Sequence, residues 1–103
     1  MAYVPVNVDS NGDADNPGVS TGDSVQWILQ SGVAGPFALN PPPNMFRRND
    51  NPKCVELSSA SPCSLTYTVK NSATMGDHDY FIDAGHCIKK SRRTGPQKIT
   101  VNA

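Results

Sequence analysis

The clearest indication of the fold comes from residues 76–87, which read GDHDYFIDAGHC, and from the closing segment 95–103, which reads GPQKITVNA. Residues 80–82 and 99–101 are short runs of aromatic and β-branched side chains, a composition that favours β-strands. The loop between them carries a histidine, a cysteine and a run of cations. A histidine beside a cysteine in such a loop is where a small β protein would hold a metal ion or a disulfide.

The clearest strand signal upstream is residues 24–30, SVQWILQ. Their alternation places Val25, Trp27 and Leu29 on one face, with Trp27 as a core anchor. Residues 65–69, LTYTV, alternate in the same way, which predicts a strand with Leu65 and its alternate neighbours inward.

The rest of the chain is divided by turn-forming residues. Residues 3–8 and 35–39 predict two further strands, whereas 9–21 and 71–77 predict loops. Residues 40–53, with three consecutive prolines, predict an irregular excursion with one helical turn. Helical periodicity is otherwise missing from the sequence. We therefore predict an all-β antiparallel sandwich or Greek-key barrel of six or seven strands.

Length and charge limit the classes of function. The chain has 103 residues, which predicts a single domain over 1–103. Nine acidic and nine basic residues cancel, which argues against a general nucleic-acid or membrane-surface binder. No apolar run approaches the roughly 20 residues of a transmembrane segment. No signal peptide is visible ahead of the first strand-like residues, which predicts either a cytosolic protein or a mature exported domain.

Two motifs resemble those of cupredoxins, the small copper-binding β-sandwiches. Residues 22–27, GDSVQW, resemble their Gly-Asp-x-Val-x-Trp strand. The end of the chain is similar to the phytocyanin branch, which reads Tyr-Phe-Ile-Cys, Gly-His-Cys and Gly-Gln-Lys in that order. Here stand YFID at 80–83, GHC at 85–87 and QK at 97–98. The resemblance implies a cupredoxin-like Greek-key β-sandwich of six to eight strands.

The same resemblance implies an incomplete set of copper ligands. A type 1 copper site needs two imidazoles, a thiolate and a weak axial group. By position, His86 matches one imidazole and Gln97 the axial ligand. Phe37 stands where the other histidine is expected and Asp83 where the thiolate is expected. A carboxylate cannot replace a soft thiolate, so the resemblance implies a degenerate copper site, similar to that of the early-nodulin-like relatives.

The three cysteines allow one disulfide and one odd thiol. The resemblance implies the pair Cys54–Cys87, while Cys63–Cys87 and Cys54–Cys63 stay open as alternatives. The implied bridge closes a loop of about 33 residues and would contribute roughly 3–4 kcal/mol. It also implies an oxidising compartment, so we expect an extracellular or periplasmic protein.

Other sites are less well supported. Strand alternation places His78 opposite to Asp79 and Asp83, which argues against a Zn²⁺ or Cu²⁺ site that joins them with His86. Residues 9–15, DSNGDAD, resemble a calcium loop but lack its closing glutamate, so we expect a solvated turn. The serines at 58, 59 and 61 lie in no nucleophile elbow, and we do not expect an enzyme.

The sequence thus predicts a non-catalytic binding or interaction module that uses no cofactor. Its expected docking surface for an acidic protein or a polyanionic glycan is the basic cluster Lys89, Lys90, Arg92 and Arg93. The alternative is a copper-binding electron-transfer protein. Its non-standard ligands would be His86, Gln97 and Cys87.

Overall fold

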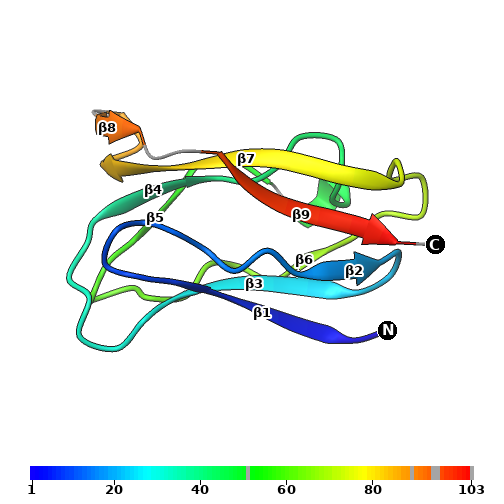
Figure 1. Cartoon of the computed structure of the whole chain (residues 1–103), viewed down its shortest axis with the longest axis horizontal. Helices are drawn as coiled ribbons and strands as arrows, with labels where there is room; N and C mark the ends of the chain where they lie inside the picture. The colour runs from blue at the N-terminus through cyan, green and yellow to red at the C-terminus, as the bar shows by residue number, and fades with distance from the viewer. Residues whose placement is uncertain (51, 89, 94–95, 103) are drawn as a thin grey trace.

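The structure of the protein is a computed structural model that describes residues 1–50, 52–88, 90–93 and 96–102, with only the backbone described at 90–93. Two β-sheets lie face to face (Figure 1). The smaller sheet has the order β1-β3-β6, from β1 (Tyr3–Val8), β3 (Ser24–Leu29) and β6 (Tyr67–Thr68). No helix in the described ranges is long and apolar enough to cross a membrane.

The larger sheet has the order β2-β9-β7-β4-β5, with β8 also paired to β7. Its members are β2 (Gly18–Ser20), β4 (Phe37–Asn40), β5 (Val55–Leu57), β7 (Gly76–Gly85), β8 (Lys90–Arg93) and β9 (Gln97–Asn102). The predicted helical turn is a single 3-10 turn, Arg48–Asp50.

Trp27 lies at the centre of the core between the sheets. Its side chain is fully buried, and its ring makes edge contacts with Phe46, Tyr67 and Tyr80. The indole Nε1–H donates a hydrogen bond of 2.9 Å to Tyr80 Oη. This contact joins β3 of one sheet to β7 of the other, so the predicted role of Trp27 as a core anchor is confirmed.

The sheets are mixed rather than purely antiparallel. β1 runs parallel to β3, and β2 runs parallel to β9. Parallel neighbours need crossover connections instead of hairpins. The chain makes one when it leaves β1, adds β2 to the opposite sheet and returns as β3. The antiparallel prediction was wrong for these two pairs.

The strand count of the described residues exceeds the prediction because β2, β5 and β8 have only three or four residues each. Leu65, predicted to point inward, is instead exposed. Ser64 Oγ accepts the Trp27 N–H at 2.9 Å, so a side chain takes the place of a carbonyl in the ladder. Regular pairing on this side therefore begins only at Tyr67, and the predicted strand shortens to two residues.

Candidate functional site

The pairing of β4 with β7 brings three of the predicted site positions to one end of the larger sheet. Phe37 pairs with Ala84, and Ala38 pairs with Asp83. The Gly85 N–H then donates a 3.0 Å hydrogen bond to Pro36 O, and His86 follows directly. The backbones of Phe37, Asp83 and His86 therefore lie close together at this end of the sheet.

Their side chains nevertheless diverge. Residues directly opposite in an antiparallel pair share a face, and successive residues alternate. Phe37 belongs to the hydrophobic core between the sheets, whereas Ala38 and Asp83 are buried outside that core cluster. Phe37 thus faces the opposite sheet and Asp83 faces away from it.

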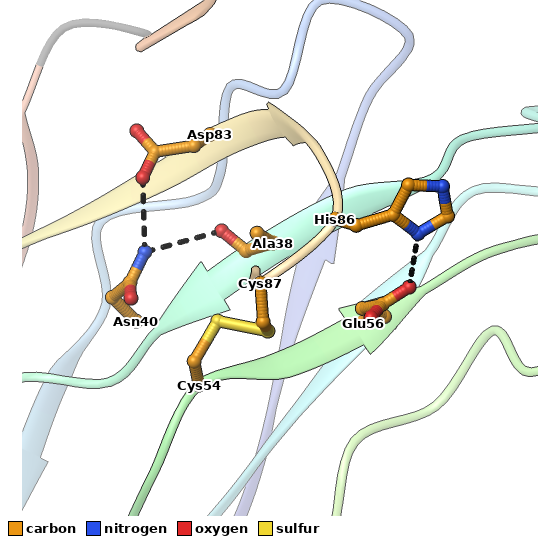
Figure 2. The surroundings of a disulfide bond; sticks show 7 residues. All are labelled: Ala38, Asn40, Cys54, Glu56, Asp83, His86 and Cys87. Carbon is orange, nitrogen blue, oxygen red and sulfur yellow. Dashed lines mark hydrogen bonds and ion pairs between the residues drawn. A yellow bond between two sulfur atoms is a disulfide. The ribbon is translucent and has the colours of Figure 1, made fainter. Parts of the chain in front are cut away.

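Asp83 lies in a polar environment on this outer face. Its carboxyl group is fully buried, and Asn40 Nδ2 donates to its Oδ2 at 3.1 Å (Figure 2). The same amide nitrogen donates to Ala38 O at 3.3 Å. Asn40 therefore ties β4 to β7 through one side chain. A buried carboxyl group with an amide donor is a hard oxygen acceptor, unlike a copper thiolate.

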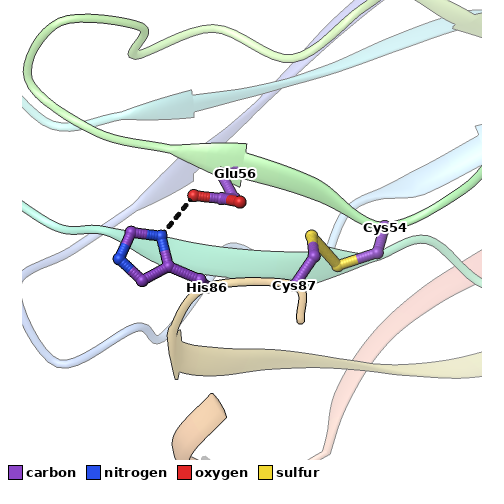
Figure 3. A network of polar contacts seen from close by, with 4 residues as sticks. All are labelled: Cys54, Glu56, His86 and Cys87. Carbon is purple, nitrogen blue, oxygen red and sulfur yellow. Dashed lines mark hydrogen bonds and ion pairs between the residues drawn. A yellow bond between two sulfur atoms is a disulfide. The ribbon is translucent and has the colours of Figure 1, made fainter. Parts of the chain in front are cut away.

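His86 lies at the surface and contacts a residue that the sequence did not point to. Its Nδ1–H donates to Glu56 Oε1 at 2.6 Å (Figure 3). Because a carboxylate only accepts, the hydrogen is on Nδ1 and Nε2 faces away from Glu56. The hydrogen bond from His86 is the largest cause that lowers the pKa of Glu56 below its ordinary value. The side chains are 62% and 44% exposed, so the pair is worth little to stability.

Gln97 is not near His86. It pairs with Tyr80 in β7, five residues before Gly85, which is roughly 16 Å along an extended strand. Its Oε1 accepts the Ala14 N–H at 3.0 Å. The residue predicted as the axial ligand therefore anchors the loop before β2, and the structure does not bring it together with His86.

The disulfide Cys54–Cys87 is confirmed, with an S–S distance of 2.10 Å and a Cα–Cα distance of 5.9 Å. Cys63 is a free, exposed cysteine. Both alternative pairings are therefore wrong. In this oxidised state Cys87 has no thiolate to offer, which removes the only sulfur from the ligand set of the predicted electron carrier.

The remaining metal candidates do not converge either. His78 Nε2 contacts Thr74 O at 2.7 Å, at the opposite end of β7 from His86. Asp9 Oδ1 accepts the N–H groups of Asn11 and Asp13 at 2.9 and 3.0 Å, which closes the 9–15 loop as a turn. Across the described residues, no group of three His, Cys, Asp or Glu side chains is placed to hold a metal ion.

The basic cluster is described only in part. Lys89 lies outside the described residues, and for the others the structure describes only the backbone of β8. In the register of β7 with β8, Lys90 lies opposite Gly85, Arg92 opposite Ala84 and Arg93 opposite Asp83. Lys90, Arg92 and Arg93 therefore lie in a strand that pairs with the end of β7, where the sequence predicted a loop.

An open cleft of about 450 Å³ lies beside these positions. It is lined by Ser10, by the loop residues 32–36 and by Phe37, Ala84 and Gly85. Apart from Ser10, its lining residues are apolar or glycine. The cleft therefore offers no charged side chain for catalysis or metal binding.

Glu56 and Asn40 are two site residues that the sequence did not predict. Glu56 carried a weak signal, because it stands two residues after Cys54 and a strand would place both on one face. Asn40 carried none, because it precedes three prolines in a stretch that is typical of a loop.

No protein-family model matches the chain, and no curated protein matches it either. Among solved structures, it is similar to the oxidised form of plastocyanin from Dryopteris crassirhizoma. The TM-score is 0.50 and the identity 18%, over 96% of this chain and 100% of that one. It is also similar to a mutant of amicyanin in its reduced Cu(I) form at pH 4. Here the TM-score is 0.49 and the identity 13%, over 97% of this chain and 82% of that one.

The sandwich and its likeness to plastocyanin show that the chain has a cupredoxin-like β-sandwich fold. At this identity the likeness concerns the fold alone, and the closer resemblance to phytocyanins stays a prediction. The donor set of this sandwich does not fit a type 1 copper ion. Two predicted ligand positions hold a phenyl ring and a buried carboxyl group, and the other two lie far apart.

Proposed function

We propose that this chain is a non-catalytic binding module with a cupredoxin-like fold and a degenerate copper site, and that it docks a polyanionic partner. The observation that carries the proposal is the divergence of the four ligand positions. Phe37 packs into the core while Asp83 faces the outer side of the sheet. His86 is engaged by Glu56, and Gln97 by the backbone of the loop before β2.

The docking surface in this proposal is the basic cluster Lys89, Lys90, Arg92 and Arg93. Four cations within five residues concentrate positive charge in one stretch of a chain of zero net charge. The hairpin of β7 and β8 gives the backbone of this segment a fixed register. An acidic protein and a sulfated or phosphorylated glycan present the same chemistry to such a surface.

We place the module in an oxidising compartment, extracellular or periplasmic. The support is the Cys54–Cys87 disulfide, because disulfides form in such compartments.

A comparison of two charge variants tests the proposal. Lys90→Gln/Arg92→Gln and Arg47→Gln/Arg48→Gln each remove two positive charges, the second from the other basic cluster. Binding to a sulfated glycan and to a polyglutamate is measured by calorimetry at several salt concentrations. We expect the first variant to weaken binding severalfold and to flatten its salt dependence, because fewer ion pairs form with the partner.

The second variant serves as the control and should bind as the unmodified protein does. Equal weakening by both variants would indicate a response to overall charge and would contradict a specific surface. Failure of the unmodified protein to bind either polyanion would end the proposal.

A further inference from the structure

The segment 86–88 crosses the outer face of β4. β4 lies between β7 and β5 in the sheet, and the disulfide joins the end of β7 to the start of β5. Two strand spacings amount to about 10 Å. The Cα atoms of Cys54 and Cys87 are only 5.9 Å apart, so Cys87 has left the line of β7 and lies over β4 (Figure 2).

Ala38 lies on the face of β4 that this segment crosses. Ala38 is fully buried although it lies outside the core cluster, whereas Glu56, its register partner in β5, is exposed. A small side chain at position 38 leaves room for the segment above it. Figure 3 shows His86 and Cys87 directed from this segment toward Glu56 and Cys54.

The base of the segment is built to bend. The register of β7 with β8 shifts between Ala84 and Gly85, and such irregularities bend a strand. Gly85 has a φ of 102°, a left-handed conformation that glycine adopts without strain. Segment 86–88 therefore turns over β4 at Gly85.

The disulfide and the His86–Glu56 hydrogen bond both hold segment 86–88 in this position. The second is solvent-exposed and weak. Both cysteines are partly exposed, and exposed disulfides are more readily reduced than buried ones.

We propose that Cys54–Cys87 is a redox-controlled clasp whose reduction releases segment 86–88 from β4 and uncovers Ala38 while the sandwich stays folded. The reductant is a dithiol. One of its thiolates attacks a sulfur of the bridge and forms a mixed disulfide, and its second thiol then displaces the protein sulfur. Two electrons and two protons pass to the protein, which gains two thiols, and the reductant leaves as a cyclic disulfide.

The test measures how far a soluble paramagnetic probe broadens individual alanine methyl resonances in NMR spectra. The protein carries Cys63→Ser, which removes the odd thiol from disulfide exchange. Ala73 is buried in the core and Ala60 is exposed, so these two methyl groups define the scale. In the oxidised protein we expect the methyl resonance of Ala38 to be broadened as little as that of Ala73. After reduction with dithiothreitol its broadening should rise to that of Ala60.

Two variants separate the effect of the bridge from that of the reductant and of the surface pair. Cys54→Ser/Cys87→Ser, again with Cys63→Ser, should show an exposed Ala38 without any reductant. Glu56→Gln should leave Ala38 protected from the probe in the oxidised protein, because the disulfide is sufficient to hold segment 86–88. Continued protection of Ala38 after reduction would overturn the proposal. Broadening of Ala73 together with Ala38 would also overturn it, because the bridge would then hold the whole fold.

Discussion

Ala38 and Asp83 lie directly opposite one another on β4 and β7, and both are fully buried on the side of the sheet that faces away from the core. The larger sheet is therefore covered on both faces at this end. The inner face packs against the smaller sheet, and the outer face carries the buried Ala38 and Asp83. The position expected to hold a copper thiolate holds a hydrogen-bonded carboxyl group in this outer layer.

Asn40→Ala tests how much this outer layer depends on one amide. The change removes the donor to Asp83 Oδ2 and to Ala38 O. Loss of a donor to the buried carboxyl group of Asp83 should cost about 1–3 kcal/mol of unfolding free energy, measured in urea at pH 7. Asn7→Ala is the matched control, because Asn7 Nδ2 also donates to a carboxylate, that of Asp15, but at the surface. A control that loses as much stability would contradict a special role for the hydrogen bond from Asn40 to the buried Asp83.

Tyr80→Phe tests the hydrogen bond between the sheets. The change leaves the buried Trp27 Nε1–H without its acceptor, which should cost about 1–3 kcal/mol at pH 7. Tyr3→Phe is the control, because Tyr3 is exposed and its hydroxyl donates to Gln26 at the surface. We expect the control to stay within about 0.5 kcal/mol of the unmodified protein.

The burial of Tyr80 should also make the protein less stable at alkaline pH. Burial raises the pKa of Tyr80 from 10.0 to about 12, so the unfolded chain loses this proton first. The contribution of the neutral hydroxyl is fully present below pH 10 and disappears as the pH rises through about 12. Between these values the unmodified protein should lose about 2–3 kcal/mol more than Tyr80→Phe. Parallel pH profiles of the two proteins would contradict the burial of this hydroxyl.

His86→Gln tests the surface pair. The hydrogen bond from His86, followed by its charge, lowers the pKa of Glu56, so removal of the imidazole should raise that pKa toward 4.5. In the unmodified protein the contribution of Glu56 to stability is present at pH values above its ordinary pKa. It disappears as the pH falls through its lower pKa in the folded protein. An NMR titration of the Glu56 carboxyl carbon gives the measurement. His78→Gln should leave this titration unchanged, and an equal shift there would refute the assignment to His86.

The central strands could be predicted from the sequence because burial imposes their pattern. Val25, Trp27 and Leu29 alternate because one side of β3 faces the core, and all three are buried as predicted. β2 and β5 could not be predicted, because three-residue strands carry no readable period. Their pairing with β9 and β4 comes from tertiary contacts.

The site could be predicted only in part. The Cys54–Cys87 bridge followed from the family resemblance and is confirmed. The opposite orientation of Phe37 and Asp83 depends on the register of β4 with β7, which neither segment encodes by itself. The distance between Gln97 and His86 arises because β9 pairs with the far half of β7.

A titration of the oxidised protein with Cu(II), followed by visible absorption and by metal analysis after gel filtration, tests the central claim most directly. Because the ligand positions diverge and Cys87 is bonded to Cys54, we predict no intense thiolate-to-copper absorption and no stoichiometric copper. One tightly bound copper per chain with that absorption would contradict the degenerate site.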